Sequence, residues 1–336
     1  MEKGKSNAWI WIVAAVVIIA IVGLFAFGTG SPAAPASVST TIAAVASGGS
    51  GSTGNTSMMN ETVAHPMEVV AAENFWGSLL SQLCGVHCNV TSIVTDPNAD
   101  PHEYEANAND AKLIANARFV VVNGVGYDDW ALQLLAASPN PNRTVLNVAN
   151  LLGVVNGSNP HLWYNPHYVN ETVKQMYLDL VQVDPNNATY YAQQYANVTS
   201  SLAKVDARMT EIRQQFAGTK VAATESIFVY LANATGLDLV SPPAFMEAVA
   251  EGNDPPEQSV AEFQNQLESG NVSVLVYNEQ TVTPLTTQMK QIAVEHNVTI
   301  VGVTETIQPP DVSFQTWMNG ELLQLQNALN ANALGQ

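Results

Sequence analysis

Residues 100–130 read DPHEYEANANDAKLIANARFVVVNGVGYDDW, and this stretch decides the fold class. Residues 110–117 have the composition of a short helix, and the apolar run 119–122 that follows at once predicts a buried strand. The Asn-Gly pair directly after the run is typical of a turn. A helix that leads straight into a buried strand is typical of proteins with a parallel sheet flanked by helices. The stretch therefore predicts an α/β fold.

The same alternation continues on both sides of this stretch. Before it, residues 67–72 and 90–94 predict strands, with a helix at 74–83 between them. After it, strands are predicted at 145–148, 220–224, 272–277 and 297–303, and helices at 227–234, 256–268, 283–296 and 314–334. This order predicts two lobes, each with a mostly parallel sheet flanked by helices.

One predicted helix is too long for a single lobe. Residues 186–216 contain neither Gly nor Pro, and they follow Pro185, with Asn186 or Asn187 available as a helix cap. A helix of about 30 residues spans about 45 Å, so we expect it to run along both lobes. The predicted divisions are an N-terminal lobe over 65–185, a connecting helix over 186–217 and a C-terminal lobe over 218–336.

The N-terminal segment predicts attachment to a membrane. Residues 8–27 are uncharged and apolar over about 20 residues, the length that spans a bilayer, and Lys3 and Lys5 precede them. We therefore expect a single-pass anchor in the cell membrane over residues 1–28 and a flexible linker over 29–64, with the binding domain on the extracytoplasmic side. The alternative is a cleaved signal peptide with its cleavage site at 34–36.

Composition bears on the partners. The formal net charge is −18 with only 11 Lys and Arg residues, which argues against nucleic acid, because phosphate binding needs basic patches. The negative charge fits either attraction of cations or simple solubility.

Many Asn-x-Ser/Thr sequons indicate a glycosylated surface protein, although an Asn- and Thr-rich composition also generates them by chance. The sequons start at Asn55, Asn60, Asn89, Asn142, Asn156, Asn170, Asn187, Asn197, Asn233, Asn271 and Asn297.

The chain has two cysteines, Cys84 and Cys88, separated by Gly-Val-His. Two thiolates are too few for a zinc site made of cysteines alone, which usually has four ligands. Outside the cell, such a pair predicts a short-range disulfide. A redox or metal role that includes His87 is the open alternative.

Two histidines and two glutamates in predicted loops are the candidate metal ligands. His102 lies in the loop after the second predicted strand, and His161 follows a Gly- and Asn-rich loop. Glu225 and Glu305 each follow a predicted strand, which is where ligands bind in open α/β sheets. Two imidazoles and two carboxylates together supply a four-point site for a divalent ion. Taken singly, each is more often a loop or helix-cap residue.

At these positions the chain resembles a known family, the metal-binding substrate-binding proteins of ABC importers for zinc, manganese or iron (cluster A-I). Residues 100–106, DPHEYEA, resemble the family motif Asp-Pro-His-x-Tyr-Glu-Pro, and residues 159–166, NPHLWYNP, resemble its Pro-His-x-Trp motif. Residues 223–237, ATESIFVYLANATGL, and 299–307, TIVGVTETI, resemble the two remaining ligand segments. The resemblance covers about residues 67–334.

The resemblance implies four metal ligands: His102, His161, Glu225 and Glu305. Glu305 stands where the family usually has Asp, and Glu279 is a rival for this position. His167 is expected to be structural or to lie outside the ligand shell. The chain departs from the family twice more, because Ala106 replaces the motif's last Pro and an apparent transmembrane anchor replaces the N-terminal lipid cysteine.

The resemblance also implies a function and partners. Such proteins capture one divalent transition-metal ion between their lobes and deliver it to the permease and ATPase subunits of an importer, so we expect a monomer without enzymatic activity. Two carboxylates favour Mn²⁺ or Fe²⁺, whereas the affinity order of divalent ions favours Zn²⁺ over Mn²⁺. A surface adhesion module of the same fold and a metallohydrolase are the alternatives, although the sequence contains no HExxH or nucleophile motif.

Overall fold

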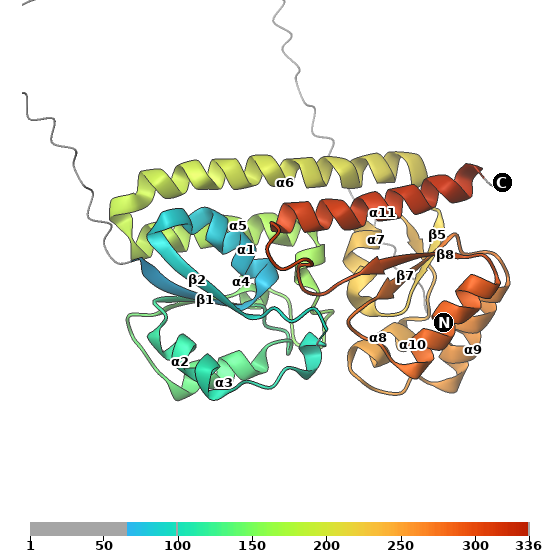
Figure 1. Cartoon of the computed structure of the whole chain (residues 1–336), viewed down its shortest axis with the longest axis horizontal. Helices are drawn as coiled ribbons and strands as arrows, with labels where there is room; N and C mark the ends of the chain where they lie inside the picture. Colours follow the sequence, from blue (N-terminus) through green and yellow to red (C-terminus); the bar gives the residue numbers. More distant parts are fainter. Residues whose placement is uncertain (1–65, 99, 335–336) are drawn as a thin grey trace, which may run out of the picture. The chain divides into compact units, whose positions relative to one another are not determined.

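The computed structural model describes residues 66–98 and 100–334 (Figure 1). The predicted anchor (1–28) and linker (29–64) lie outside these residues. Within the described part of the chain, no helix has both the length and the apolar character needed to cross a bilayer.

The N-terminal lobe is built on four parallel strands in the order β2-β1-β3-β4. The strands are β1 (Met67–Glu73), β2 (Cys88–Val94), β3 (Phe119–Val122) and β4 (Thr144–Asn147). β1 and β3 form the centre, and all four residues of β3 are buried, as expected for a strand covered on both faces. Because the strands are parallel, their carboxyl ends share one edge of the sheet.

Helices cover both faces of this sheet. They are α1 (Asn74–Cys84), α2 (Ala108–Asn116), α3 (Asp129–Ala137), α4 (Val148–Leu152) and α5 (Pro166–Val183). Alternate residues of β3 face opposite sides: Phe119 and Val121 pack in the cluster of α1 and α5, and Val120 and Val122 pack in that of α2 and α3. The sheet is therefore the middle layer of a three-layer lobe.

The C-terminal lobe repeats this plan with the strand order β6-β5-β7-β8, again all parallel. The strands are β5 (Lys220–Ala223), β6 (Asp238–Leu239), β7 (Val274–Asn278) and β8 (Thr299–Val303). The helices around them are α7 (Val229–Thr235), α8 (Pro243–Ala250), α9 (Glu257–Glu268) and α10 (Pro284–Glu295). β7 lies between β5 and β8, so its carboxyl end is flanked by both of their ends.

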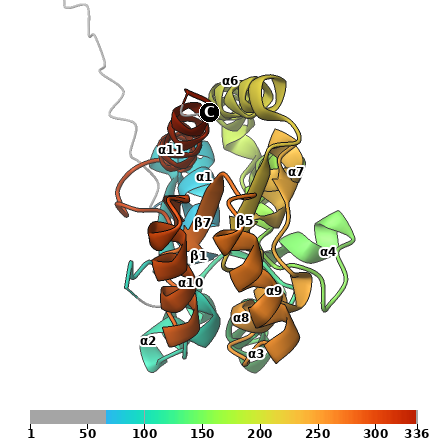
Figure 2. The ribbon, with the colours of Figure 1, turned by 90° about the vertical axis from the view of Figure 1, so that its right-hand side faces the viewer.

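Two long helices join the lobes. The helix α6 (Ala188–Phe216) packs on α1 and α5 of the first lobe and on α7 of the second. The final helix, α11 (Phe314–Leu334), lies beside α6 and covers β8, as Figures 1 and 2 show. At its start, the Phe314 N–H donates to Ser78 Oγ of α1 at 3.0 Å. The predicted fold class is confirmed, and α11 adds a second connection between the lobes.

The structure corrects several predicted boundaries. The long helix begins at Ala188 because Pro185–Asn187 form a separate 3₁₀ helix. β4 ends at Asn147, whose side chain caps α4, so Val148 starts a helix rather than ending a strand. Five helices and strands were not predicted: α3, α4, α5, α8 and β6. Of these, α5 is the longest, and Asn165 caps it just before Pro166 at its first turn.

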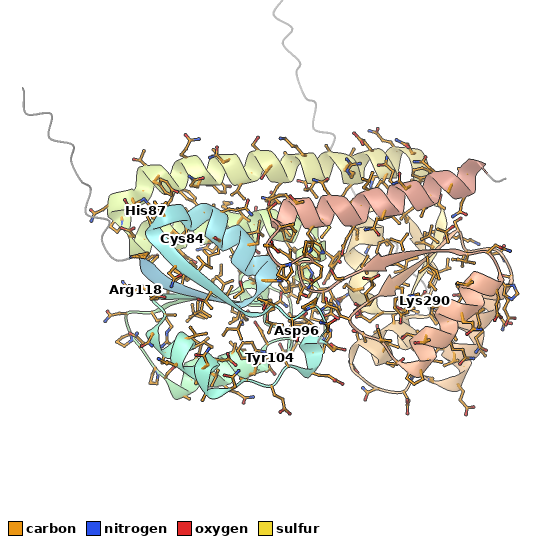
Figure 3. All side chains as sticks on the ribbon, in the orientation of Figure 1. Cys84, His87, Asp96, Tyr104, Arg118 and Lys290 are labelled. Carbon is orange, nitrogen blue, oxygen red and sulfur yellow. A yellow bond between two sulfur atoms is a disulfide. The ribbon has the colours of Figure 1, made fainter. Side chains whose placement is uncertain are left out.

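Cys84 and Cys88 form a disulfide, with their Cα atoms 5.4 Å apart. The bond joins the end of α1 to the start of β2, at the end of the lobe where Figure 3 labels Cys84 and His87. The His87 ring packs edge-on against Tyr190 of α6, with ring centroids 4.6 Å apart. With both sulfurs bonded, the pair has a structural role rather than that of thiolate ligands.

Candidate metal site

His102 is positioned by a short capped turn. It lies in a 3₁₀ helix, Pro101–Glu103, whose preceding residue Asp100 accepts a hydrogen bond from the His102 N–H at 2.9 Å. The carboxylate of Asp100 also accepts from the Thr281 hydroxyl of the other lobe at 3.1 Å. The His102 side chain is 18% exposed. The turn therefore presents one imidazole to the space between the lobes while leaving part of it accessible.

His161 lies directly before a second 3₁₀ helix, Leu162–Tyr164, and is fully buried. Its Nδ1 is 2.7 Å from Asn159 Oδ1. The Asn159 amide nitrogen donates to the Ser226 carbonyl at 2.7 Å, which identifies Oδ1 as the acceptor facing the ring. His161 thus carries its proton on Nδ1 and directs the lone pair of Nε2 toward the other candidate ligands. Burial, and then the neighbouring His102, hold its pKa well below the usual range, which keeps the ring neutral.

The two carboxylates come from strand ends of the C-terminal lobe. Glu225 is the second residue after β5, Glu305 is the second residue after β8, and both are fully buried. Asn278, at the end of β7, donates to Glu225 Oε2 at 2.7 Å and to Glu305 Oε1 at 2.8 Å. Burial, followed by the charge of Glu305, raises the pKa of Glu225 well above its usual range. Two buried carboxylates so close together are costly without a cation between them.

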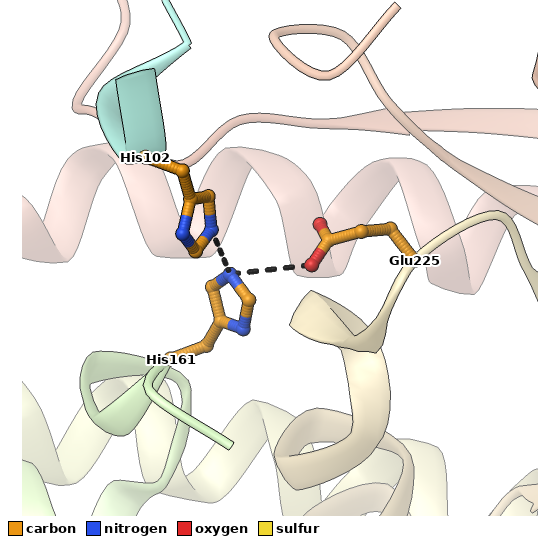
Figure 4. A group of neighbouring side chains, drawn as sticks. All are labelled: His102, His161 and Glu225. Carbon is orange, nitrogen blue, oxygen red and sulfur yellow. Dashed lines mark hydrogen bonds and ion pairs between the residues drawn. The ribbon is translucent and has the colours of Figure 1, made fainter. Parts of the chain in front are cut away.

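The four predicted residues meet at one point between the lobes. His102 Nε2 is 3.4 Å from His161 Nε2 and 3.4 Å from Glu305 Oε2. His161 Nε2 is 3.4 Å from Glu225 Oε1 and 3.8 Å from Glu305 Oε2; Figure 4 shows the group around His161. Ligand atoms about 2.1 Å from a tetrahedral centre are about 3.4 Å from one another. His102, His161 and Glu225 also have their ligand atoms within 4.8 Å of one another, and Asp100, His102 and Glu305 form a second such group. The spacing around the two histidines therefore suits a bound divalent ion.

Tyr127 is a further residue of the site that the sequence did not reveal. Its hydroxyl donates to Glu305 Oε2 at 2.7 Å, across the lobe boundary. Tyr127 ends a loop in which Val125 has φ 59°, between glycines 124 and 126 at 80° and 82°. A β-branched residue with positive φ is strained, and such strain is found where a loop must present a side chain accurately. No local signal identifies Tyr127, because its partner lies 178 positions away in the chain.

Two other residues considered from the sequence lie elsewhere. Glu279 is exposed, and its carboxylate lies over Gly302 rather than toward the histidines. His167 is exposed on the first turn of α5, with its ring 6.1 Å from that of Tyr168. Asp100, by contrast, groups with His102 and Glu305, all three offering ligand atoms within 4.8 Å of one another. Burial, and then Glu305, raise the pKa of Asp100.

A cavity of about 1320 Å³ leads from the surface to the site. Asp100, His102 and Tyr127 are among the residues that line it, whereas His161, Glu225 and Glu305 do not line it. Its lining contains no Lys or Arg and includes six acidic residues: Asp100, Glu103, Asp238, Glu247, Glu251 and Glu279. This sign of charge attracts cations, and the ion would pass His102 to reach the buried ligands.

The fold and site match known proteins. The profile of the family described as "ZnuA: Zinc-uptake complex component A periplasmic" matches residues 69–328, which is most of the chain. The chain belongs to the ZnuA family. Residues 102, 161, 225 and 305 of this family member all lie within the matched region.

Relatives in the ZnuA family carry names that refer to metals. The manganese-binding lipoprotein MntA of Halalkalibacterium halodurans is 26% identical over 52% of this chain and 59% of its own length. The manganese ABC transporter substrate-binding lipoprotein PsaA of Streptococcus anginosus is 26% identical over 59% of this chain and 67% of its own. The matches thus span 59–67% of the length of these relatives.

Solved structures show the same fold. The periplasmic zinc-binding protein TroA of Treponema pallidum superposes with a TM-score of 0.68 at 15% identity, over 79% of this chain and 99% of its own. At this identity the likeness establishes the two-lobed architecture and nothing finer.

Proposed function

We propose that this protein captures one divalent transition-metal ion outside the cytoplasm and delivers it to the permease and ATPase subunits of an ABC importer. His102, His161, Glu225 and Glu305 are the proposed ligands. The observation that carries the proposal is the set of 3.4 Å separations among their nitrogen and oxygen atoms, which come from both lobes. Two neutral imidazoles and two carboxylates carry a charge of −2, which balances a divalent ion.

The arrangement suggests how capture works. The N-terminal lobe supplies the two imidazoles and the C-terminal lobe the two carboxylates, so an ion in the site holds the lobes together. Because α6 contacts both lobes and α11 begins on α1, we expect small shifts at the cleft rather than a wide hinge motion. Release then requires the importer to separate ligands that the closed form keeps together.

The direct test is metal content and titration calorimetry of the full chain. We expect one ion per chain and tight binding without turnover of hydrolysable substrates. The ion is Zn²⁺ or Mn²⁺: the ZnuA family is described by zinc uptake, whereas the relatives MntA and PsaA are named for manganese. Absence of any stoichiometric divalent ion would overturn the proposal, and turnover would support a metallohydrolase instead.

Two further proposals concern location. We propose that residues 1–28 anchor the protein in the cell membrane, with residues 65–336 on the outer side, and protease protection of the N-terminus in intact cells tests this. We also propose that exposed sequons carry glycans; Asn142, Asn197 and Asn271 are exposed in the folded domain. Mass spectrometry of protein from its native host would show added mass on those asparagines.

A further inference from the structure

Asn278 occupies a position from which a single side chain reaches both carboxylates. It is the last residue of β7, and β7 lies between β5 and β8, the strands that lead to Glu225 and Glu305. Asn278 is 1% exposed. An amide group buried at the end of the central strand must satisfy its hydrogen bonds within the site.

The orientation of this amide is fixed by its neighbours. Its Oδ1 accepts a hydrogen bond from the Gln280 N–H at 3.0 Å, so the two amide protons point the other way. These protons meet Glu225 Oε2 at 2.7 Å and Glu305 Oε1 at 2.8 Å. The Thr281 hydroxyl lies 3.1 Å from the same Glu305 oxygen. One side chain thus engages one oxygen of each carboxylate.

The remaining two oxygens face the histidines. Glu225 Oε1 is 3.4 Å from His161 Nε2, and Glu305 Oε2 is 3.4 Å from His102 Nε2. Each glutamate therefore directs one oxygen toward the centre of the site and one oxygen toward Asn278. Turning either carboxylate to offer both oxygens to an ion would weaken a short hydrogen bond to a buried amide, which is unfavourable.

We infer that Asn278 determines the metal preference of the site, because it limits Glu225 and Glu305 to one ligand oxygen each and so favours a four-coordinate ion such as Zn²⁺ over Mn²⁺. This inference rests on the proposed function. Zn²⁺ is commonly four-coordinate and tetrahedral with nitrogen and oxygen ligands. Mn²⁺ favours six-coordinate, oxygen-rich sites, which here would require bidentate carboxylates or added ligands.

The test compares Zn²⁺ and Mn²⁺ affinities of the full chain before and after Asn278→Ala. Loss of a side chain that orients a metal ligand typically lowers affinity by about 10–100-fold. We expect a loss of this size for Zn²⁺ and an unchanged or higher affinity for Mn²⁺, so the Zn²⁺/Mn²⁺ affinity ratio falls by at least about tenfold. Equal losses for both ions would overturn the inference.

A matched control is Asn74→Ala. Asn74 is also a buried asparagine, 5% exposed, and it bonds the Ile307 backbone across the lobe boundary without touching a proposed ligand. Any effect of this variant on lobe closure should act on both ions alike. We therefore expect its Zn²⁺/Mn²⁺ ratio to match that of the unmodified protein, and a ratio change equal to that of Asn278→Ala would count against a specific role of Asn278.

A second measurement needs no variant and so does not depend on folding of Asn278→Ala. Co²⁺ absorbs visible light strongly in a tetrahedral site and weakly in a six-coordinate one. We expect strong absorption from the Co²⁺-loaded protein, and a weak six-coordinate spectrum would overturn the inference while leaving the proposed function intact. If no divalent ion binds the unmodified protein, the proposed function itself fails.

Discussion

The two lobes share a strand order but contribute different kinds of side chain to the site. The N-terminal lobe provides imidazoles on 3₁₀ turns, one partly exposed and one buried and neutral. The C-terminal lobe provides two fully buried carboxylates at strand ends, joined through Asn278. The carboxylates are thus enclosed, whereas the N-terminal lobe carries His102, the candidate ligand that is partly exposed. The comparison teaches that neither lobe alone holds a complete site.

Removing the buried imidazole should have the largest effect. His161→Ala deletes a fully buried proposed ligand whose Nε2 lies within 3.8 Å of His102, Glu225 and Glu305, so we expect metal affinity to fall by more than about 100-fold in calorimetry. His167→Ala is the control, because that histidine is exposed and outside the site. Retained affinity in His161→Ala would show that His161 is not a ligand of the ion.

A buried carboxyl group distinguishes the N-terminal lobe in a second way. Glu73 is 1% exposed at the end of β1 and lies beside the carboxyl group of Asp128. Burial, and then Asp128, raise its pKa well above the usual value of 4.5. The folded protein therefore keeps a proton that the unfolded chain loses above that pH. The contribution of Glu73 to the free energy of unfolding is therefore full below pH 4.5, and it declines as pH rises toward the pKa of Glu73 in the folded protein.

Glu73→Gln should remove this loss of stability with rising pH. Relative to the variant, the unfolding equilibrium constant of the ion-free protein should rise by up to about tenfold per pH unit between pH 5 and the folded pKa. Denaturant unfolding over pH 5–8 measures it, with Glu68→Gln on the exposed part of the same strand as the control. Parallel stability curves for Glu73→Gln and the unmodified protein would show that Glu73 ionises normally.

Removing the hydrogen bond that Tyr127 makes across the lobe boundary should have a smaller effect on metal affinity. Tyr127→Phe removes the hydroxyl that donates to Glu305 Oε2, the oxygen that faces His102. We expect metal affinity to fall by about tenfold, because one hydrogen bond to a charged group is lost. Tyr177→Phe is a suitable control, because that ring stacks on Tyr195 away from the site. An unchanged affinity would show that Glu305 is held by its own lobe alone.

The smallest effect on the site is expected from the disulfide. Replacing Cys84 and Cys88 by serine opens a short loop, so stability should fall by about 2 kcal/mol while metal affinity stays the same. Thermal unfolding and calorimetry on the same double variant measure both quantities. A marked loss of affinity would mean that the far end of α1 is coupled to the cleft.

Much of the fold could be predicted because its signals are local. Phe119–Val122 and Phe314–Leu334 match their predicted ranges, and most other predicted strands and helices are shifted by no more than two residues. The helix α5 was missed although its signal is local: Val169, Val173, Met176 and Leu180 recur at helical spacing and are buried. Contact with α1 and α6 covers this apolar face.

For the site, the sequence predicts the candidate ligands and the loops that carry them. Four separate segments carry His102, His161, Glu225 and Glu305, and each segment follows a recognisable local pattern. Only the tertiary structure decided that Glu305 rather than Glu279 faces the histidines, and that Tyr127 and Asn278 hold the carboxylates. Hydrogen bonds between residues far apart in sequence leave no periodic or spacing signal, because their geometry exists only after the strands are aligned.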